Sequence, residues 1–97
     1  MRIDLNFPDF QKDFFTLQKN EGYALIKTFK ILSRMDFDQL RRSPGLNLER
    51  IKNMKTRKGN SLYSIRITRS FRAVISIQDD YLRFISLHPD HDSAYKK

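Results

Sequence analysis

The sequence predicts an α+β domain in which an N-terminal strand and a two-helix hairpin pack on one face of a mainly antiparallel, twisted sheet. Helical spacing of apolar residues dominates the first half of the chain, and three strand-like runs follow one another from residue 62 onward. The 97 residues suit one domain, spanning positions 1–97, with a modest core. No composition shift or low-complexity linker indicates a second domain.

The chain begins with a short strand pattern. Ile3 and Leu5 alternate with polar residues, which predicts an edge strand with one covered face. Pro8 then marks a helix start, because proline is well tolerated in the first helical turn. The apolar residues of this first helix recur at helical spacing: Phe10, Phe14 and Leu17.

The second helix is expected to follow an interruption at 20–22, where Asn, Glu and Gly come together. Leu25, Phe29 and Leu32 would line its buried face. A last helical turn is expected from Asp36 to Leu40, before the Ser-Pro-Gly break at 43–45. Residues 51–55 are expected to form a strand, and the basic residues at 56–60 a turn.

The three runs from residue 62 onward read as a β-meander, because each is rich in β-branched and aromatic residues that alternate in character. A three-residue turn at 69–71 would set Ile67 opposite Ala73 and Ile65 opposite Ile75. This pairing would give the hairpin an apolar face, which we expect to pack against the core.

A two-residue turn at 79–80 would continue the same apolar face, with Ile77 opposite Leu82 and Ile75 opposite Phe84. The reverse face would gather three arginines among small and apolar residues. Its expected members are Ser64, Arg66, Thr68, Arg72, Val74, Ser76, Arg83, Ile85 and Leu87.

The formal net charge of +8 is concentrated between residues 50 and 78, a stretch with eight basic residues and no acidic one. A local cationic field attracts a polyanion, nucleic acid first, and also acidic proteins or a membrane surface. A plain solvated face is the alternative. The residues predicted to bind RNA are Lys52, Lys55, Arg57, Lys58 and Arg83.

The absence of cysteine excludes a disulfide framework and a thiol nucleophile. No apolar stretch approaches the roughly 20 residues needed to span a bilayer, so we expect a soluble, cytoplasmic protein without a membrane partner. The string from His88 to Asp92 contains metal-ligand types, but Pro89 extends the backbone and no ligand cluster lies elsewhere. We therefore expect neither a metal nor another cofactor.

The segments LYSIRITRSFRAVISIQDDYLRFISL and HDSAY carry a family resemblance. An Arg-Ile strand, an aromatic-Arg-x-Val strand opening and a terminal His-x-x-x-Tyr follow in this order. Together with the order of elements, they resemble the RelE/ParE superfamily of toxins from toxin–antitoxin systems. The similarity is strongest from Pro44 to Tyr95.

The resemblance implies a small toxin that a cognate antitoxin protein neutralises. Many RelE-like members cut mRNA in the ribosomal decoding site, so the expected activity is a metal-independent, ribosome-dependent endoribonuclease that inhibits translation. The resemblance implies four catalytic residues: Arg66, Arg72, His91 and Tyr95. The usual base is not matched, and Glu49 is the nearest carboxylate before the basic segment.

The expected roles follow from the chemistry of RNA cleavage by a neighbouring 2′-hydroxyl. Arg66 and Arg72 suit the phosphate because a guanidinium pairs bidentately with its oxygens. Histidine titrates near neutral pH, so His91 suits proton transfer, and Tyr95 can stack on an unpaired base. Two alternatives stay open: a ParE-like inhibitor of DNA gyrase that is not a nuclease, and an inactive toxin-like binding module.

Overall fold

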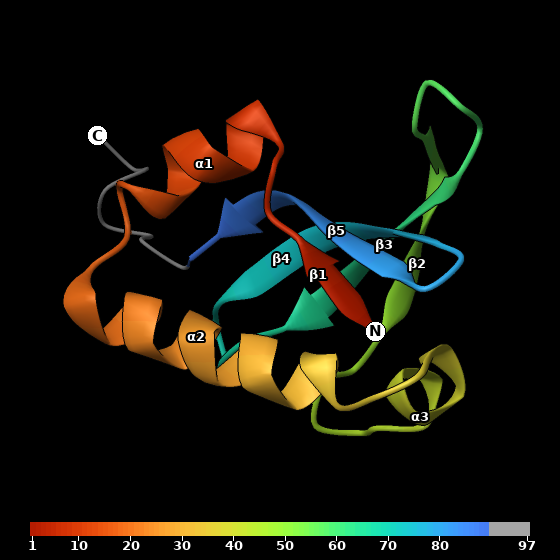
Figure 1. Ribbon diagram of the computed structural model, residues 1–97. Helices are drawn as coiled ribbons and strands as arrows, with labels where there is room; N and C mark the ends of the chain where they lie inside the picture. Colours follow the sequence, from red (N-terminus) through yellow and green to blue (C-terminus); the bar gives the residue numbers. More distant parts are fainter. Residues whose placement is uncertain (90–97) are drawn as a thin grey trace.

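Three helices and one five-stranded sheet make up the protein in the computed structural model, which describes residues 1–89 (Figure 1). The strand order is β1-β5-β4-β3-β2, with β1 parallel to β5 and the other neighbours antiparallel. The α+β fold class is therefore confirmed. The elements are β1 Arg2–Asp4, α1 Pro8–Phe14, α2 Lys19–Ser33, α3 Phe37–Arg41, β2 Glu49–Lys55, β3 Ser61–Arg66, β4 Arg72–Gln78 and β5 Tyr81–His88.

The second helix begins before the predicted interruption at 20–22, so that expectation is wrong. Gln18 is the N-cap of α2, and its backbone N–H donates to Glu21 Oε1 at 2.7 Å in a capping box. This bond satisfies the N–H of the N-cap residue, and Gly22 lies inside the first turn of the helix. The expected restart at Asp36 is confirmed, because its carboxylate caps α3 by accepting from the Gln39 N–H at 2.8 Å.

One face of the sheet and the helices share a single apolar core. The Phe84 ring of β5 lies 5.7 Å from the ring of Phe10 in α1 and 5.1 Å from that of Phe29 in α2. These aromatic contacts join both long helices to the centre of the sheet. The buried core residues are Phe10, Leu25, Leu32, Leu40, Leu46, Ile65, Phe71, Ala73, Ile75, Leu82, Phe84 and Leu87.

The first hairpin of the meander has the predicted faces but different partners. Ile65 lies opposite Ala73 rather than Ile75, a shift of two residues that keeps both side chains on the core face. The connection is centred one residue earlier than expected: Ile67 N–H donates to Phe71 O at 2.7 Å, and Phe71 N–H donates to Thr68 O at 3.3 Å. Phe71 is thereby buried in the core rather than part of an exposed turn.

The second hairpin confirms the predicted pairs, with Ile77 opposite Leu82 and Ile75 opposite Phe84. Beyond Phe84 a β-bulge shifts the register, so that Leu87 lies opposite Ala73 on the core face. The expectation that Leu87 belongs to the reverse face is therefore wrong. The carboxylate of Asp13 in α1 holds this end of β5 by accepting from the Leu87 N–H at 2.8 Å.

The strand expected at 51–55 is confirmed and begins earlier, at Glu49. Its register shifts between Ile51 and Lys55, and Asn53 adopts a φ of 65°, a left-handed conformation that asparagine tolerates well. The hairpin of β2 and β3 projects beyond the rest of the molecule (Figure 1). Within residues 1–89, none of the helices is both long and apolar enough to span a bilayer.

Candidate functional site

Two predicted site residues and one histidine form a row across the reverse face of the sheet. Arg72 on β4 lies opposite Arg66 on β3 and opposite His88 on β5. Because neighbouring strands are about 4.8 Å apart, the row from Arg66 to His88 spans roughly 10 Å. The register therefore places two arginines and a histidine at neighbouring positions on one face of the sheet.

The guanidinium of Arg72 is held by three acceptors, all through Nη2. The acceptors are Ser64 Oγ at 2.7 Å, Glu49 Oε1 at 3.0 Å and Asn47 O at 3.2 Å. Its Nε and Nη1 groups have no hydrogen-bond partner among residues 1–89. The protein thus orients the side chain, and two edges of the planar fork stay available to an anion.

Glu49 brings a carboxylate to this row, because its Oε1 pairs with Arg72. It begins β2 opposite Ser64 and is exposed, so one of its oxygens can meet a ligand while Arg72 holds the other. From the sequence, Glu49 was only the last acid before the basic segment. Its pairing with Arg72 depends on the β2–β3 register, which no local pattern encodes.

His88 was not predicted as a site residue, and the β5 register places it beside Arg72. Its Nε2 lies 2.8 Å from Ser86 Oγ, and the side chain is exposed. The sequence held one signal for it, a histidine at the end of the last strand pattern. Arg66 is also exposed and has no side-chain hydrogen bond or ion pair among the described residues.

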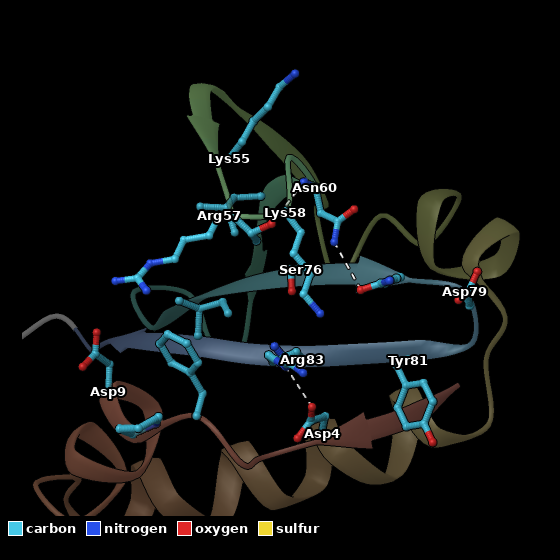
Figure 2. A pocket seen from close by; sticks show the side chains of 16 residues that line it. Asp4, Asp9, Lys55, Arg57, Lys58, Asn60, Ser76, Asp79, Tyr81 and Arg83 are labelled. Carbon is cyan, nitrogen blue, oxygen red and sulfur yellow. Dashed lines mark hydrogen bonds and ion pairs between the residues drawn. The ribbon is translucent and has the colours of Figure 1, made fainter.

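A groove of about 960 Å³ occupies the other end of the reverse face, between the tip of the β2–β3 hairpin and the segment joining β1 to α1 (Figure 2). Its floor includes Leu62, Ser76 and Ile85. The hairpin tip is ordered by its own hydrogen bonds, since Gly59 N–H donates to Thr56 O and Thr56 N–H to Asn60 O, each at 2.9 Å. The groove therefore has a defined wall.

Four of the five residues predicted to bind RNA line this groove: Lys55, Arg57, Lys58 and Arg83. Figure 2 shows Arg57 and Lys58 extending over the sheet, whereas Lys55 points away from it. None of the three cations on the hairpin forms an ion pair within the described chain. Lys52 is exposed on β2 and does not line the groove.

Arg83 faces the groove but is already paired. Its Nε donates to Asp4 Oδ2 at 2.8 Å, linking β5 to β1. The pKa of the Asp4 carboxyl is lowered because the Asn6 N–H donates to it at 2.9 Å and because Arg83 donates to its other oxygen. Asp4 therefore stays ionised and offsets the charge that Arg83 brings to the groove.

Two predicted site residues, His91 and Tyr95, lie outside the described residues. The His88–Asp92 string falls largely outside them as well. Within positions 1–89, no group of three or more His, Cys, Asp or Glu side chains is arranged to hold a metal ion.

The reverse face therefore carries two separate centres. The first, around Arg66, Arg72, Glu49 and His88, combines side chains of the types that can bind a phosphate with side chains of the types that can transfer a proton. The second, the groove, combines cations with apolar and amide side chains. Arg72 and Gln78 mark the two ends of β4, about 20 Å apart, so a ligand that reaches both must be extended.

Comparison with solved structures identifies the fold. A chain of the archaeal RelE-RelB complex from Pyrococcus horikoshii OT3 is 16% identical, with 93% of this chain and 94% of that chain covered and a TM-score of 0.64. A chain of the YoeB dimer from Staphylococcus aureus is 23% identical, covers 89% and 94%, and has a TM-score of 0.53. A chain of the RelB-RelE antitoxin-toxin complex from Methanococcus jannaschii is 18% identical, covers 99% and 96%, and has a TM-score of 0.51.

No protein-family model and no curated protein sequence matches the chain. The structural agreement extends over nearly the whole length of this chain and of each similar chain. The protein therefore has the RelE-like fold.

Proposed function

We propose that this chain, with its RelE-like fold, is the toxin of a type II toxin–antitoxin system and cleaves mRNA on the ribosome. The observation that carries this proposal is the row of Arg66, Arg72 and His88 beside Glu49, on the sheet face that the helices leave open. A base, an acid and paired cations are what RNA cleavage by its own 2′-hydroxyl requires.

The proposed reaction is a transesterification within the RNA. Glu49 accepts the proton of a 2′-hydroxyl, whose oxygen attacks the adjacent phosphorus. The bond to the 5′-oxygen breaks, and this leaving oxygen takes a proton from His88 or His91. The products are a 2′,3′-cyclic phosphate and a free 5′-hydroxyl, so no metal is needed for the nucleophile.

The arginines act on the phosphate in this scheme. The free Nε and Nη1 edges of Arg72, together with Arg66, neutralise the negative charge that grows on the phosphate oxygens. Tyr95 would stack on a base next to the cleaved bond, as aromatic side chains commonly do with unpaired RNA.

A protein antitoxin is the proposed partner in the resting cell. Two of the similar structures are complexes of RelE with RelB, described in one case as antitoxin and toxin. By analogy, an antitoxin segment would lie across this chain and block the Arg66–Arg72–His88 row. Purification of the chain co-expressed with the product of a neighbouring reading frame should give a stable complex without cleavage activity.

The activity is tested with translating ribosomes, a defined mRNA and the purified chain. We expect mRNA fragments ending in a 2′,3′-cyclic phosphate, detected by the resistance of these ends to ligation until the cyclic phosphate is removed. The same mRNA without ribosomes should be cut far more slowly. Intact mRNA on the ribosome would rule the proposal out.

Single substitutions then assign the roles. Arg72→Ala and Glu49→Gln should each lower the cleavage rate by about 100-fold or more, since each removes a group acting on the transition state. Smaller losses are expected for His88→Ala and His91→Ala if either histidine can take over proton donation from the other. Tyr95→Phe should also reduce cleavage. Arg34→Ala, at the end of α2, is the matched control and should cleave normally.

A ParE-like gyrase inhibitor is the second candidate, and the internal bonds of Arg72 favour it. An arginine that holds Glu49, Ser64 and Asn47 together can be structural rather than catalytic. Inhibition of DNA supercoiling that survives both Arg72→Ala and His91→Ala would support this function. An inactive binding module would cause no growth arrest yet still bind the antitoxin.

A further inference from the structure

The groove contains a pair of amide side chains that the proposed chemistry does not use. Asn60, at the end of the hairpin tip, donates from Nδ2 to Gln78 Oε1 of β4 at 3.2 Å (Figure 2). The pair joins the projecting hairpin to the body of the sheet. Both residues line the groove rather than the row around Arg72.

Each amide keeps hydrogen-bonding capacity after this contact. Asn60 Oδ1 accepts from no group, and Gln78 Nε2 donates to no group, within residues 1–89. One free acceptor, on Asn60, and one free donor, on Gln78, therefore belong to two residues that line the groove. Reversing both amide orientations would leave the same combination, so the pattern does not depend on which atom is oxygen.

The surroundings of the pair suit a nucleobase. Leu62 is 7% exposed on the floor, and Ile85 and the half-buried Phe7 add apolar surface on which a flat ring can lie. Arg57 and Lys58 extend over the same space and supply positive charge for the attached phosphates (Figure 2). An acidic peptide would use the cations but not the donor and acceptor pair.

We propose that this groove binds an unpaired adenine of single-stranded RNA, and that Asn60 and Gln78 read its edge. Adenine offers an N6 donor beside a ring-nitrogen acceptor, the pattern that Asn and Gln side chains recognise by paired hydrogen bonds. This inference rests on the proposed function for its substrate class. Gln78 lies about 20 Å from Arg72 along β4, so the base read lies several nucleotides away from the cleaved bond.

The test measures binding rather than cleavage. Fluorescein-labelled 2′-O-methyl hexamers of A, C, G and U cannot be cut through a 2′-hydroxyl, and their affinity for the full-length chain is read by fluorescence anisotropy. We expect the A hexamer to bind at least about fivefold more tightly than the others, the lower end of discrimination by paired hydrogen bonds. Asn60→Ala and Gln78→Ala should each remove this preference while keeping the general affinity for RNA.

Asn20→Ala is the matched control, because it removes an exposed amide on α2, away from the groove. It should keep the adenine preference. Equal affinity for all four hexamers, a preference that survives Asn60→Ala and Gln78→Ala, or tighter binding of a ten-residue glutamate peptide than of any hexamer would overturn the inference. Because no bond is cut in this assay, its outcome is separate from that of the ribosome experiment.

Discussion

Arg72 shows how one side chain can be both part of the structure and available to a ligand. Three acceptors share its Nη2 and fix the plane of the guanidinium, while Nε and Nη1 have no partner among residues 1–89. A side chain that is already ordered loses little rotamer entropy when an anion binds. Lysine at this position would keep the charge but lose the planar fork.

At the same scale, the hydrogen bonds that Asp4 accepts from the Asn6 N–H and from Arg83 predict a pH dependence of stability. Folding lowers the pKa of Asp4, so the folded protein releases this proton more readily than the unfolded chain. The stabilisation is present above the unfolded pKa of about 3.9 and is lost as the pH falls through the lower folded value. Protonation of Asp4 would therefore contribute to acid denaturation.

Asp4→Asn should lower the free energy of unfolding at pH 7 by about 0.5–1 kcal/mol, a typical value for a partly exposed pair. The difference from wild type should shrink as the pH falls through the lowered pKa of Asp4 in the folded state, because the protonated carboxyl no longer pairs with Arg83. Urea denaturation at several pH values measures this. The Arg2 ion pair with Asp80 is more exposed, so Asp80→Asn serves as a control with a smaller expected effect. A constant difference across the pH range would contradict the assignment.

At the scale of elements, the bulge in β5 decides which side chains face the core. It adds a residue between Phe84 and Ser86, so that Leu87 is buried at 5% exposure while Ile85 lines the groove. The same shift brings His88 opposite Arg72. One extra residue in one strand thus serves both the core and the candidate site.

The bulge predicts unequal effects for two similar substitutions. Leu87→Ala should lower the free energy of unfolding by about 2–4 kcal/mol, because it leaves a cavity in the core. Ile85→Ala, the matched control, should cost about 1 kcal/mol, because the side chain is only partly buried. Chemical denaturation of both variants measures the difference. Equal losses, or a larger loss for Ile85→Ala, would mean that β5 has no bulge.

At the scale of the molecule, the sheet separates two environments. The helices cover one face and enclose the core, and the other face holds the Arg72 row and the groove. The charge is also separated, because the positive excess lies in the segment that forms β2, β3 and the start of β4. A polyanion would therefore meet the reverse face first.

This separation predicts where the salt dependence of RNA binding arises. The double substitution Arg57→Ser with Lys58→Ser should reduce the slope of log K against log salt by about 1.4, from two lost contacts with a single strand. The matched double substitution Lys27→Ser with Lys30→Ser removes the same charge from the exposed side of α2 and should leave the slope unchanged. Titrations of an RNA hexamer at several salt concentrations measure both. Equal reductions would show that net charge alone governs binding.

The alternation of apolar residues predicted the strands of the meander and their two faces, with Leu87 as an exception, because burial on one face imposes a period of two on a strand. Helical spacing and the cap at Asp36 likewise predicted three helical segments, although α2 begins before the expected interruption at 20–22. The sequence alone also located the cationic segment and placed Arg66 and Arg72 on one face, since residue parity along a strand is a local property.

Only the tertiary structure decided which of these residues meet. The two-residue shift of the first hairpin, the bulge in β5 and the pairing of β2 with β3 bring Glu49 and His88 to Arg72 and separate Arg83 from them. The groove and its Asn60–Gln78 pair depend on the same contacts. These features arise from packing between segments far apart in the chain. Several strand registers would bury the same apolar face, so the local sequence pattern cannot choose among them, and the packing does.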